Sequence, residues 1–156
     1  MVTLERIKSG QVRAEMELIN SDPYFNKITR GKEIIDLKEA LEEIYDSEGL
    51  GTERYFVLHN DERIGILEFL MENPQDGQTW LGLLLIGKSW QGKGLGRQTL
   101  EMFLAVMQER KVPRVRIGVA VGNEPAHHFW MMQGFKPIAS NKKEDGREII
   151  IYERLV

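Results

Sequence analysis

The spacing of apolar and polar residues along the chain predicts a mixture of strands and helices. Residues 2–7 alternate between apolar and polar, which is typical of a half-buried strand. Apolar residues then recur at helical spacing up to Asn20, and Ser9 can begin that helix as its cap. Because the residue before a proline is disfavoured in the α region, Asp22-Pro23 is expected to end the helix. Tyr24 and Phe25 are therefore expected in a loop.

The middle of the chain predicts a second helix and then a hairpin. The helix is expected over residues 31–46, with an apolar side made of Ile34, Ile35, Leu37, Leu41, Ile44 and Tyr45. The hairpin is expected to pair residues 54–59 with residues 63–72 about a turn at 60–62. Its second strand contains an almost unbroken apolar run, so we expect both of its faces to be covered.

The stretch from Trp80 to Gly96 organises the rest of the chain. An apolar strand ends at Ile86, a glycine-rich turn follows, and a helical pattern then runs to about residue 111. Residues 115–121 form the next predicted strand. A strand, a helix and a strand joined by short loops predict a βαβ unit with parallel strands and a right-handed crossover.

The glycine-rich turn has the chemistry of an anion-binding loop. Gly92, Gly94 and Gly96 allow the backbone to bend so that several N–H groups point at one ligand, at a helix N-terminus that carries partial positive charge. The turn lacks the sequence of a mononucleotide P-loop and that of a dinucleotide fingerprint. Taken alone, it is also compatible with a flexible turn that caps a helix. The residues that we expect to bind a phosphate or pyrophosphate are Gln91, Gly92, Lys93, Gly94, Leu95, Gly96 and Arg97.

A second motif begins at Asn123, which can cap a short helix that stops at Gly134. Residues 136–139 and 148–155 follow as a predicted strand pair, separated by a polar loop over 140–146.

Two motifs, Gln91-x-x-Gly94-x-Gly96 and Asn123-x-x-Ala126-x-x-Phe129-Trp130-x-x-x-Gly134-Phe135, together resemble those of the GCN5-related N-acetyltransferase (GNAT) family. The resemblance is strong over residues 79–136 and architectural over 1–78. It implies an α/β (α+β) fold in one domain over 1–156. The expected sheet is mixed, largely antiparallel and twisted, with about seven strands, a splayed parallel central pair and about four flanking helices.

The resemblance also implies a cofactor and a reaction. Acetyl-coenzyme A (acetyl-CoA) would place its pyrophosphate on the glycine loop and its pantetheine arm along the backbone of Leu84, Leu85 and Ile86. Asn123 would reach the cofactor, and Trp130 would pack near its thiol end. The family moves the acetyl group directly to an amine in a sequential mechanism without an acyl-enzyme. The alternative is a non-catalytic acyl-CoA-binding regulatory protein that has kept the cofactor site.

The chain departs from the family where proton transfer is concerned. Trp130 stands where many members have a tyrosine acid, and the start of the strand at residue 80 offers no carboxylate. Glu68 is our first candidate for the general base, because it is a carboxylate within an apolar strand, expected opposite Leu83. Strand parity places it on the wrong face unless a bulge intervenes. His128 is the fallback, and a structural role is open for both.

The acceptor pocket is expected to involve Tyr24, Phe25, Trp80 and Gly82, although packing against the core would explain the aromatic residues equally well. Charge is distributed unevenly: residues 33–76 carry three Lys/Arg against thirteen Asp/Glu, and residues 77–156 carry twelve against seven. A basic second half suits an anionic cofactor. An acidic middle favours a cationic small-molecule or peptide amine if it lines the acceptor site, and a solvated helix face if it does not.

Composition excludes several kinds of chemistry. The chain has no cysteine, so disulfides, thiolate metal sites and a cysteine acyl-enzyme are excluded, and we expect no metal site. No apolar run reaches the roughly 20 residues of a membrane span, and the first residues lack a secretion-signal pattern, so a cytoplasmic protein without membrane partners is expected. Scattered Lys/Arg and a net charge of −3 disfavour nucleic-acid binding. We expect a monomer or a homodimer.

Overall fold

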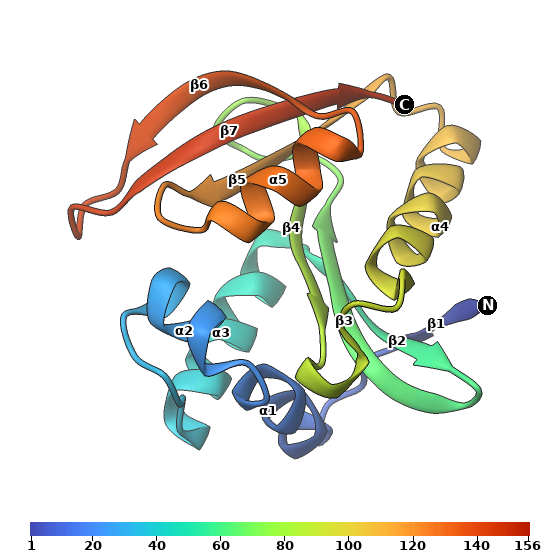
Figure 1. Cartoon of the computed structure of the whole chain (residues 1–156), viewed down its shortest axis with the longest axis vertical. Coiled ribbons are helices and arrows are strands. Elements are labelled where there is room, and N and C mark those ends of the chain that lie inside the picture. The colour runs from blue at the N-terminus through green and yellow to red at the C-terminus, as the bar shows by residue number, and fades with distance from the viewer.

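The computed structural model describes residues 1–156, and its centre is one seven-stranded sheet with the order β1-β2-β3-β4-β5-β7-β6 (Figure 1). Only β4 and β5 are parallel, and all other neighbours are antiparallel. The strands are β1 (Val2–Arg6), β2 (Glu53–His59), β3 (Glu62–Leu70), β4 (Thr79–Ile86), β5 (Arg114–Ala120), β6 (Lys136–Lys142) and β7 (Glu148–Leu155). The predicted α/β class and the splayed parallel pair are confirmed. The last hairpin is longer than predicted, because β6 continues into the expected loop.

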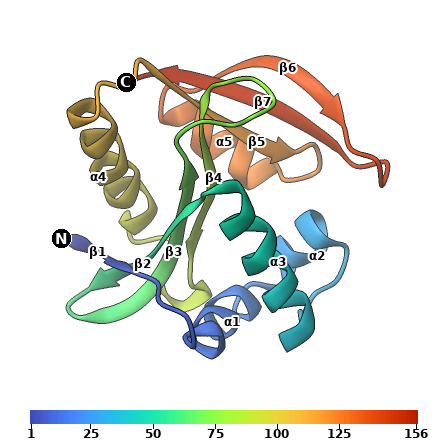
Figure 2. The same ribbon diagram turned by 180° about the vertical axis from the view of Figure 1, so that it is seen from behind.

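Five α-helices flank the sheet, one more than predicted: α1 (Val12–Asn20), α2 (Pro23–Arg30), α3 (Leu37–Leu50), α4 (Leu95–Glu109) and α5 (Glu124–Met132). Seen from behind, α1, α2 and α3 gather beside one another, away from α4 (Figure 2). None of the helices combines the length and the apolar character that crossing a bilayer requires.

The additional helix is α2, and it corrects the loop expected at Tyr24 and Phe25. Asp22 is its N-cap and accepts a hydrogen bond from the Phe25 N–H at 3.1 Å. Pro23 occupies the first turn, where the missing N–H costs nothing and the fixed φ suits a helix. Asp22-Pro23 therefore ends one helix and begins the next.

The boundaries predicted for α3 are also wrong. Asp36 and Glu39 form a capping box, so the helix begins at Leu37 and not near residue 31, and it continues to Leu50. Much of the predicted apolar side is exposed, as Leu41 and Tyr45 show with 48% and 79% of their surface accessible. Ala40 is the one buried residue of this helix.

Two apolar clusters fill the two faces of the sheet. The larger one joins buried strand residues to α4 and includes Phe103, Met107 and Phe135. The smaller one joins the sheet to α1 and to the residues around the start of α3, and it includes Phe56, Ile66 and Leu85. Strands β2, β3 and β4 thus contribute side chains to both faces, as the continuous apolar run of β3 predicts.

The hairpin of β3 and β4 pairs Glu68 with Leu83, as predicted, and contains a bulge next to this pair. Phe69 pairs with Leu81, so that Gly82 is the extra residue. The bulge changes the parity of β4: Leu81 belongs to the cluster under α4, whereas Leu83 packs against the cluster under α1. This irregularity puts Glu68 and Leu83 on the face that carries α1, α2 and α3.

Strands β4 and β5 separate soon after they begin. Their pairs are Thr79 with Val115 and Trp80 with Arg116, and beyond these the backbone edge of β4 that faces β5 has no strand partner. The resulting wedge opens toward the carboxyl ends of both strands.

Candidate active site

A cavity of about 560 Å³ occupies the wedge between β4 and β5. Its walls come from α2 and α3 on one face of the sheet, from residues 81–84 of β4 and 117–120 of β5, and from α5 on the other face. The turn of the β6–β7 hairpin completes the rim. The cavity thus passes through the sheet, and two different molecules can approach its centre from opposite faces.

The glycine loop lies at the start of α4 and presents free N–H groups. Gly94 is the N-cap with φ of 77°, and no side chain caps the helix. The first backbone hydrogen bond of the helix runs from the Gln98 N–H to the Gly94 carbonyl. The N–H groups of Leu95, Gly96 and Arg97 are therefore available to a ligand. Open space surrounds the position where a Cβ on Gly94 would project, so an anion has room there.

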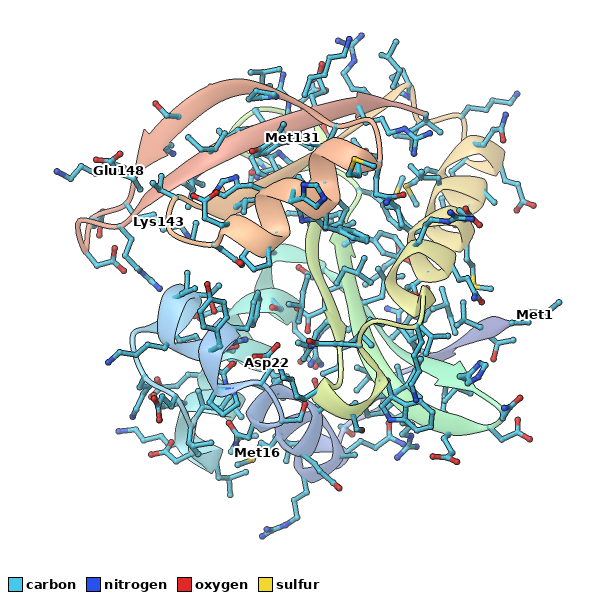
Figure 3. All side chains as sticks on the ribbon, viewed as in Figure 1. Met1, Met16, Asp22, Met131, Lys143 and Glu148 are labelled. Carbon is cyan, nitrogen blue, oxygen red and sulfur yellow. The ribbon has the colours of Figure 1, made fainter.

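The side chain of Gln91 is used within the protein. Its amide donates to Asp22 Oδ2 at 2.9 Å and to the Ile86 carbonyl at 2.8 Å. Nearby, the Lys88 N–H donates to the Ser21 hydroxyl at 3.0 Å. The junction of α1 and α2, where Figure 3 labels Asp22, thus braces the glycine loop. The Gln91 backbone N–H donates to the Lys88 carbonyl at 3.3 Å, so both its side chain and its main chain fix the loop.

Among the predicted pantetheine residues, Leu84 lines the cavity, whereas Leu85 and Ile86 bury their side chains in the two clusters. The pantetheine arm could hydrogen-bond to the main-chain groups of these residues on the side of β4 that faces β5, where β4 has no strand partner. The residues therefore fit the arm of a CoA thioester through main-chain groups.

Helix α5 supplies the other wall of the wedge. Asn123 is buried, caps the helix by accepting from the Ala126 N–H at 3.4 Å, and lines the cavity. Trp130 also lines the cavity, held edge-to-face between Phe129 and Phe135 at centroid distances of 5.0 and 5.1 Å. The structure therefore places both residues in the wall of the cavity, and their contact with a cofactor stays a prediction.

The two histidines have different surroundings, and neither lines the cavity. The His127 ring bonds to the Tyr152 hydroxyl at 2.6 Å and to the Ala120 carbonyl at 2.8 Å, so it holds α5 against the sheet. His128 is exposed on α5. Its position gives no support to the fallback role as general base.

Glu68 lies in a buried charged cluster with Arg54 of β2 and Glu15 of α1. Arg54 Nε donates to Glu68 Oε2 at 3.2 Å, and a terminal guanidinium nitrogen donates to Glu15. Burial raises the pKa of Glu15 to about 7 against the opposing effect of Arg54, and the charge of Glu68 adds to the rise. Burial likewise raises the pKa of Glu68, again opposed by Arg54. The pKa of each carboxyl group is thereby raised above its ordinary value.

The acceptor side of the cavity contains two of the four residues predicted for it. Phe25 and Gly82 line it. Tyr24 is 55% exposed and lies outside the lining. Trp80 is also outside, since its indole N–H donates to Asp76 Oδ2 at 2.9 Å and its ring packs over Gly118. Both corrections follow from geometry. Tyr24 lies on an exposed side of α2, where a loop was predicted, and Trp80 lies where β4 and β5 are still paired, before the wedge opens.

The rim of the cavity carries charge of both signs. Glu39, Glu42, Glu43 and Asp46 of α3 all line it. Lys32 pairs with Glu39 and Arg30 with Glu43, both at 2.8 Å, whereas Glu42 and Asp46 make no ion pair. Across the opening, Lys143 lies at the turn of the β6–β7 hairpin, labelled in Figure 3. The acidic middle of the chain therefore does line the acceptor side.

Comparison with known proteins agrees with this geometry. The profile of the acetyltransferase (GNAT) family matches residues 16–135. The chain belongs to the GNAT family of acetyltransferases. No curated protein sequence matches this GNAT chain closely enough to count as a relative.

Solved structures share the fold of this GNAT chain over its whole length. An acetyltransferase from Thermus thermophilus has a TM-score of 0.85 at 25% identity, with 100% of this chain and 97% of that one covered. An acetyltransferase from Salmonella typhimurium that modifies the N-terminal serine of ribosomal protein L7/L12 has a TM-score of 0.81 at 17% identity, covering 99% and 95%. Spermidine N-acetyltransferase from Vibrio cholerae, solved with CoA and spermine, has a TM-score of 0.76 at 21% identity, covering 99% and 95%.

The sequence alone did not reveal the partners of Glu68. If the β2–β3 hairpin had no bulge, its closing pair of His59 and Glu62 would set Arg54 opposite Leu67. The bulge after Val57 shifts the register by one residue, so Arg54 pairs with Glu68 instead. Nothing in the local pattern announces that bulge. Glu15 was equally hidden, because it reads as one polar position of an amphipathic helix.

Proposed function

We propose that this protein is an N-acetyltransferase that moves the acetyl group of acetyl-CoA directly to an amine of a small molecule or peptide, without an acyl-enzyme. The observation that carries the proposal is the cavity through the sheet. It joins the unpaired edge of β4 and the wall formed by α5 to an acidic opening, and the anion-binding start of α4 follows the end of β4 in the chain. Such a site can hold both reactants at once, which supplies much of the rate enhancement of a two-substrate reaction.

The cofactor half of the proposal rests on main-chain groups. The free N–H groups of Leu95, Gly96 and Arg97 suit a pyrophosphate, and the open edge of β4 suits an extended amide-containing arm. The bound thioester would supply the activated acetyl group. A GNAT acetyltransferase from Elizabethkingia anophelis of the same fold was solved with acetyl-CoA bound, at 18% identity and a TM-score of 0.69, which supports this assignment.

The acceptor half rests on charge. Glu42 and Asp46 give the opening uncompensated negative charge on the α3 side, which favours a cationic amine. The amine must lose a proton before it attacks the thioester carbonyl. Glu68 is the proposed base, acting directly or through water, and N–H groups of the wedge would stabilise the oxyanion. Trp130 has no acidic proton at neutral pH, so the departing thiolate would be protonated by solvent.

The test is amine-dependent release of CoA from acetyl-CoA over a panel of polyamines, amino acids, aminoglycosides and N-terminal peptides. The protein has no cysteine, so a thiol reagent reports CoA without background from the protein. We expect release with at least one amine and none without amine. Tight binding of acetyl-CoA with no release across the panel would contradict the proposal and favour an acyl-CoA-binding regulator.

A further inference from the structure

The charged cluster beneath the acceptor side contains two carboxylates and a single guanidinium. Arg54 presents its Nε edge to Glu68 and a terminal nitrogen to Glu15. The three residues come from β3, β2 and α1, so the cluster ties α1 to the centre of the sheet.

We propose that Glu15 and Arg54 are positioning residues for proton transfer, and that Glu15 and Glu68 take up and release one proton as a coupled pair. The inference deepens the proposed function and rests on it, since the proton would come from the acceptor ammonium.

The charge balance of the cluster supports the coupling. Arg54 keeps its proton at any working pH, so the fully ionised cluster has a net charge of −1. Arg54 is 6% exposed and Glu15 is 3% exposed. A net charge is costly in such surroundings, and uptake of one proton removes it. Whichever carboxyl holds the proton, the other remains the counter-ion of Arg54.

Exposure assigns different roles to the two carboxylates. The side chain of Glu68 is 17% exposed, whereas that of Glu15 is 4% exposed. Glu68 does not itself line the cavity, but it pairs with Leu83, which does, so it would exchange protons with the acceptor through water. Glu15 lies deeper and acts on Glu68 by competing for Arg54 and by its negative charge.

The charges around the cluster leave this balance in place. Arg30 of α2 and Glu43 of α3 act on Glu68 with opposite signs and neutralise each other in a bidentate ion pair at 2.8 and 3.0 Å. Glu48 of α3 adds a negative charge toward Glu15. No further cation is therefore available to hold both carboxylates ionised.

The proposed step balances in protons and charge. An N–H bond of the acceptor ammonium breaks and an O–H bond forms on Glu68, so the nitrogen keeps the electron pair with which it attacks. The cluster changes from −1 to neutral, and the proton leaves to solvent after the acetylated product departs.

The test compares pH profiles of kcat/KM for the wild type, Glu15→Gln and the control Glu17→Gln, which changes an exposed residue of the same helix. Glutamine can still accept from Arg54 but removes the competing charge. We expect the acidic limb to move to lower pH by about one unit. In the variant the charge of Arg54 is no longer shared with a second carboxylate, so it favours the ionised form of Glu68 more strongly. Activity well below the limb then rises by up to about tenfold. A Glu15→Gln profile that coincides with wild type overturns the inference.

A second measurement needs no turnover. With ¹³C-labelled glutamate, the carboxyl signals of Glu15 and Glu68 in the wild type are expected to move together in a step near neutral pH. Glu15→Gln and Glu68→Gln should each abolish that step. Two independent titrations at ordinary glutamate values overturn the inference even if a variant fails to fold. Absence of turnover with every amine, alongside a coupled titration, would instead count against acetyl transfer.

Discussion

Glu68 combines a raised pKa with a partly exposed side chain, which is the combination that a general base acting through water needs. Glu68→Gln should lower turnover by roughly 10²–10⁴ and remove the acidic limb of the pH–rate profile. The matched control is Glu62→Gln, at the exposed start of the same strand. If Glu68→Gln changes neither the rate nor the profile, Glu68 has a structural role and the proton leaves through water.

The raised pKa of Glu15 also predicts how stability depends on pH. Its pKa is raised from 4.5 to about 7 by burial, so the folded state binds this proton more tightly than the unfolded chain does. The free energy of unfolding therefore falls as the pH rises from about 4.5 to 7, by at most roughly 3 kcal/mol from this group. Relative to wild type, Glu15→Gln should gain stability between pH 5 and pH 8. Urea denaturation at both pH values checks this, and an equal difference at both would refute it.

The residue-scale predictions from sequence succeeded where one strand or one motif determined the answer. The pairing of Glu68 with Leu83 followed from a single turn, and the bulge at Gly82 resolved the parity conflict that accompanied it. Asn123 and Trp130 reached the cavity because a short capped helix fixes their directions. The contact of Glu15 with Arg54 joins positions 39 residues apart, and only tertiary packing determines it.

At the scale of elements, the start of α4 is the feature on which cofactor binding depends. Gly94 has φ of 77° with open space around it, so Gly94→Val strains the backbone and fills the anion site. Gly10→Val is the matched control, because Gly10 has φ of 87° and equally open surroundings outside the loop. Both variants should lose on the order of 1–2 kcal/mol of stability. Calorimetry should find acetyl-CoA binding abolished in the Gly94 variant alone; unchanged affinity there would place the pyrophosphate elsewhere.

The helices of the first 50 residues show why element boundaries were harder to predict than the strand–loop–helix core. Asp22-Pro23 supports both a helix end and a helix start, and the contact of Asp22 with the distant Gln91 cannot be seen in the local pattern. In α3 the capping box at Asp36 was a readable start signal. The apolar periodicity of that helix was misleading, because its apolar stripe faces solvent.

At the scale of the whole molecule, the splayed sheet gives the two proposed reactants separate approaches to one cavity. Helix α5 forms one wall of the wedge, and α2, α3 and the turn of the β6–β7 hairpin form the others, while the glycine loop lies at the start of α4 (Figure 1). Asp22 links the two sides, since it caps α2 and accepts from Gln91 of the glycine loop. This arrangement suits direct transfer within a ternary complex, and the chain offers no thiol to carry the acetyl group in between.

The most direct test of this account is a single-turnover, rapid-quench experiment with acetyl-labelled acetyl-CoA, excess protein and an amine found in the panel. Direct transfer predicts that labelled acetyl-amine and free CoA form in equal amounts at the same rate, with no labelled protein at any time. Labelled protein that forms before the product and then passes its label to the amine would contradict direct transfer. Failure to form any acetyl-amine from a bound ternary complex would contradict the proposed activity itself.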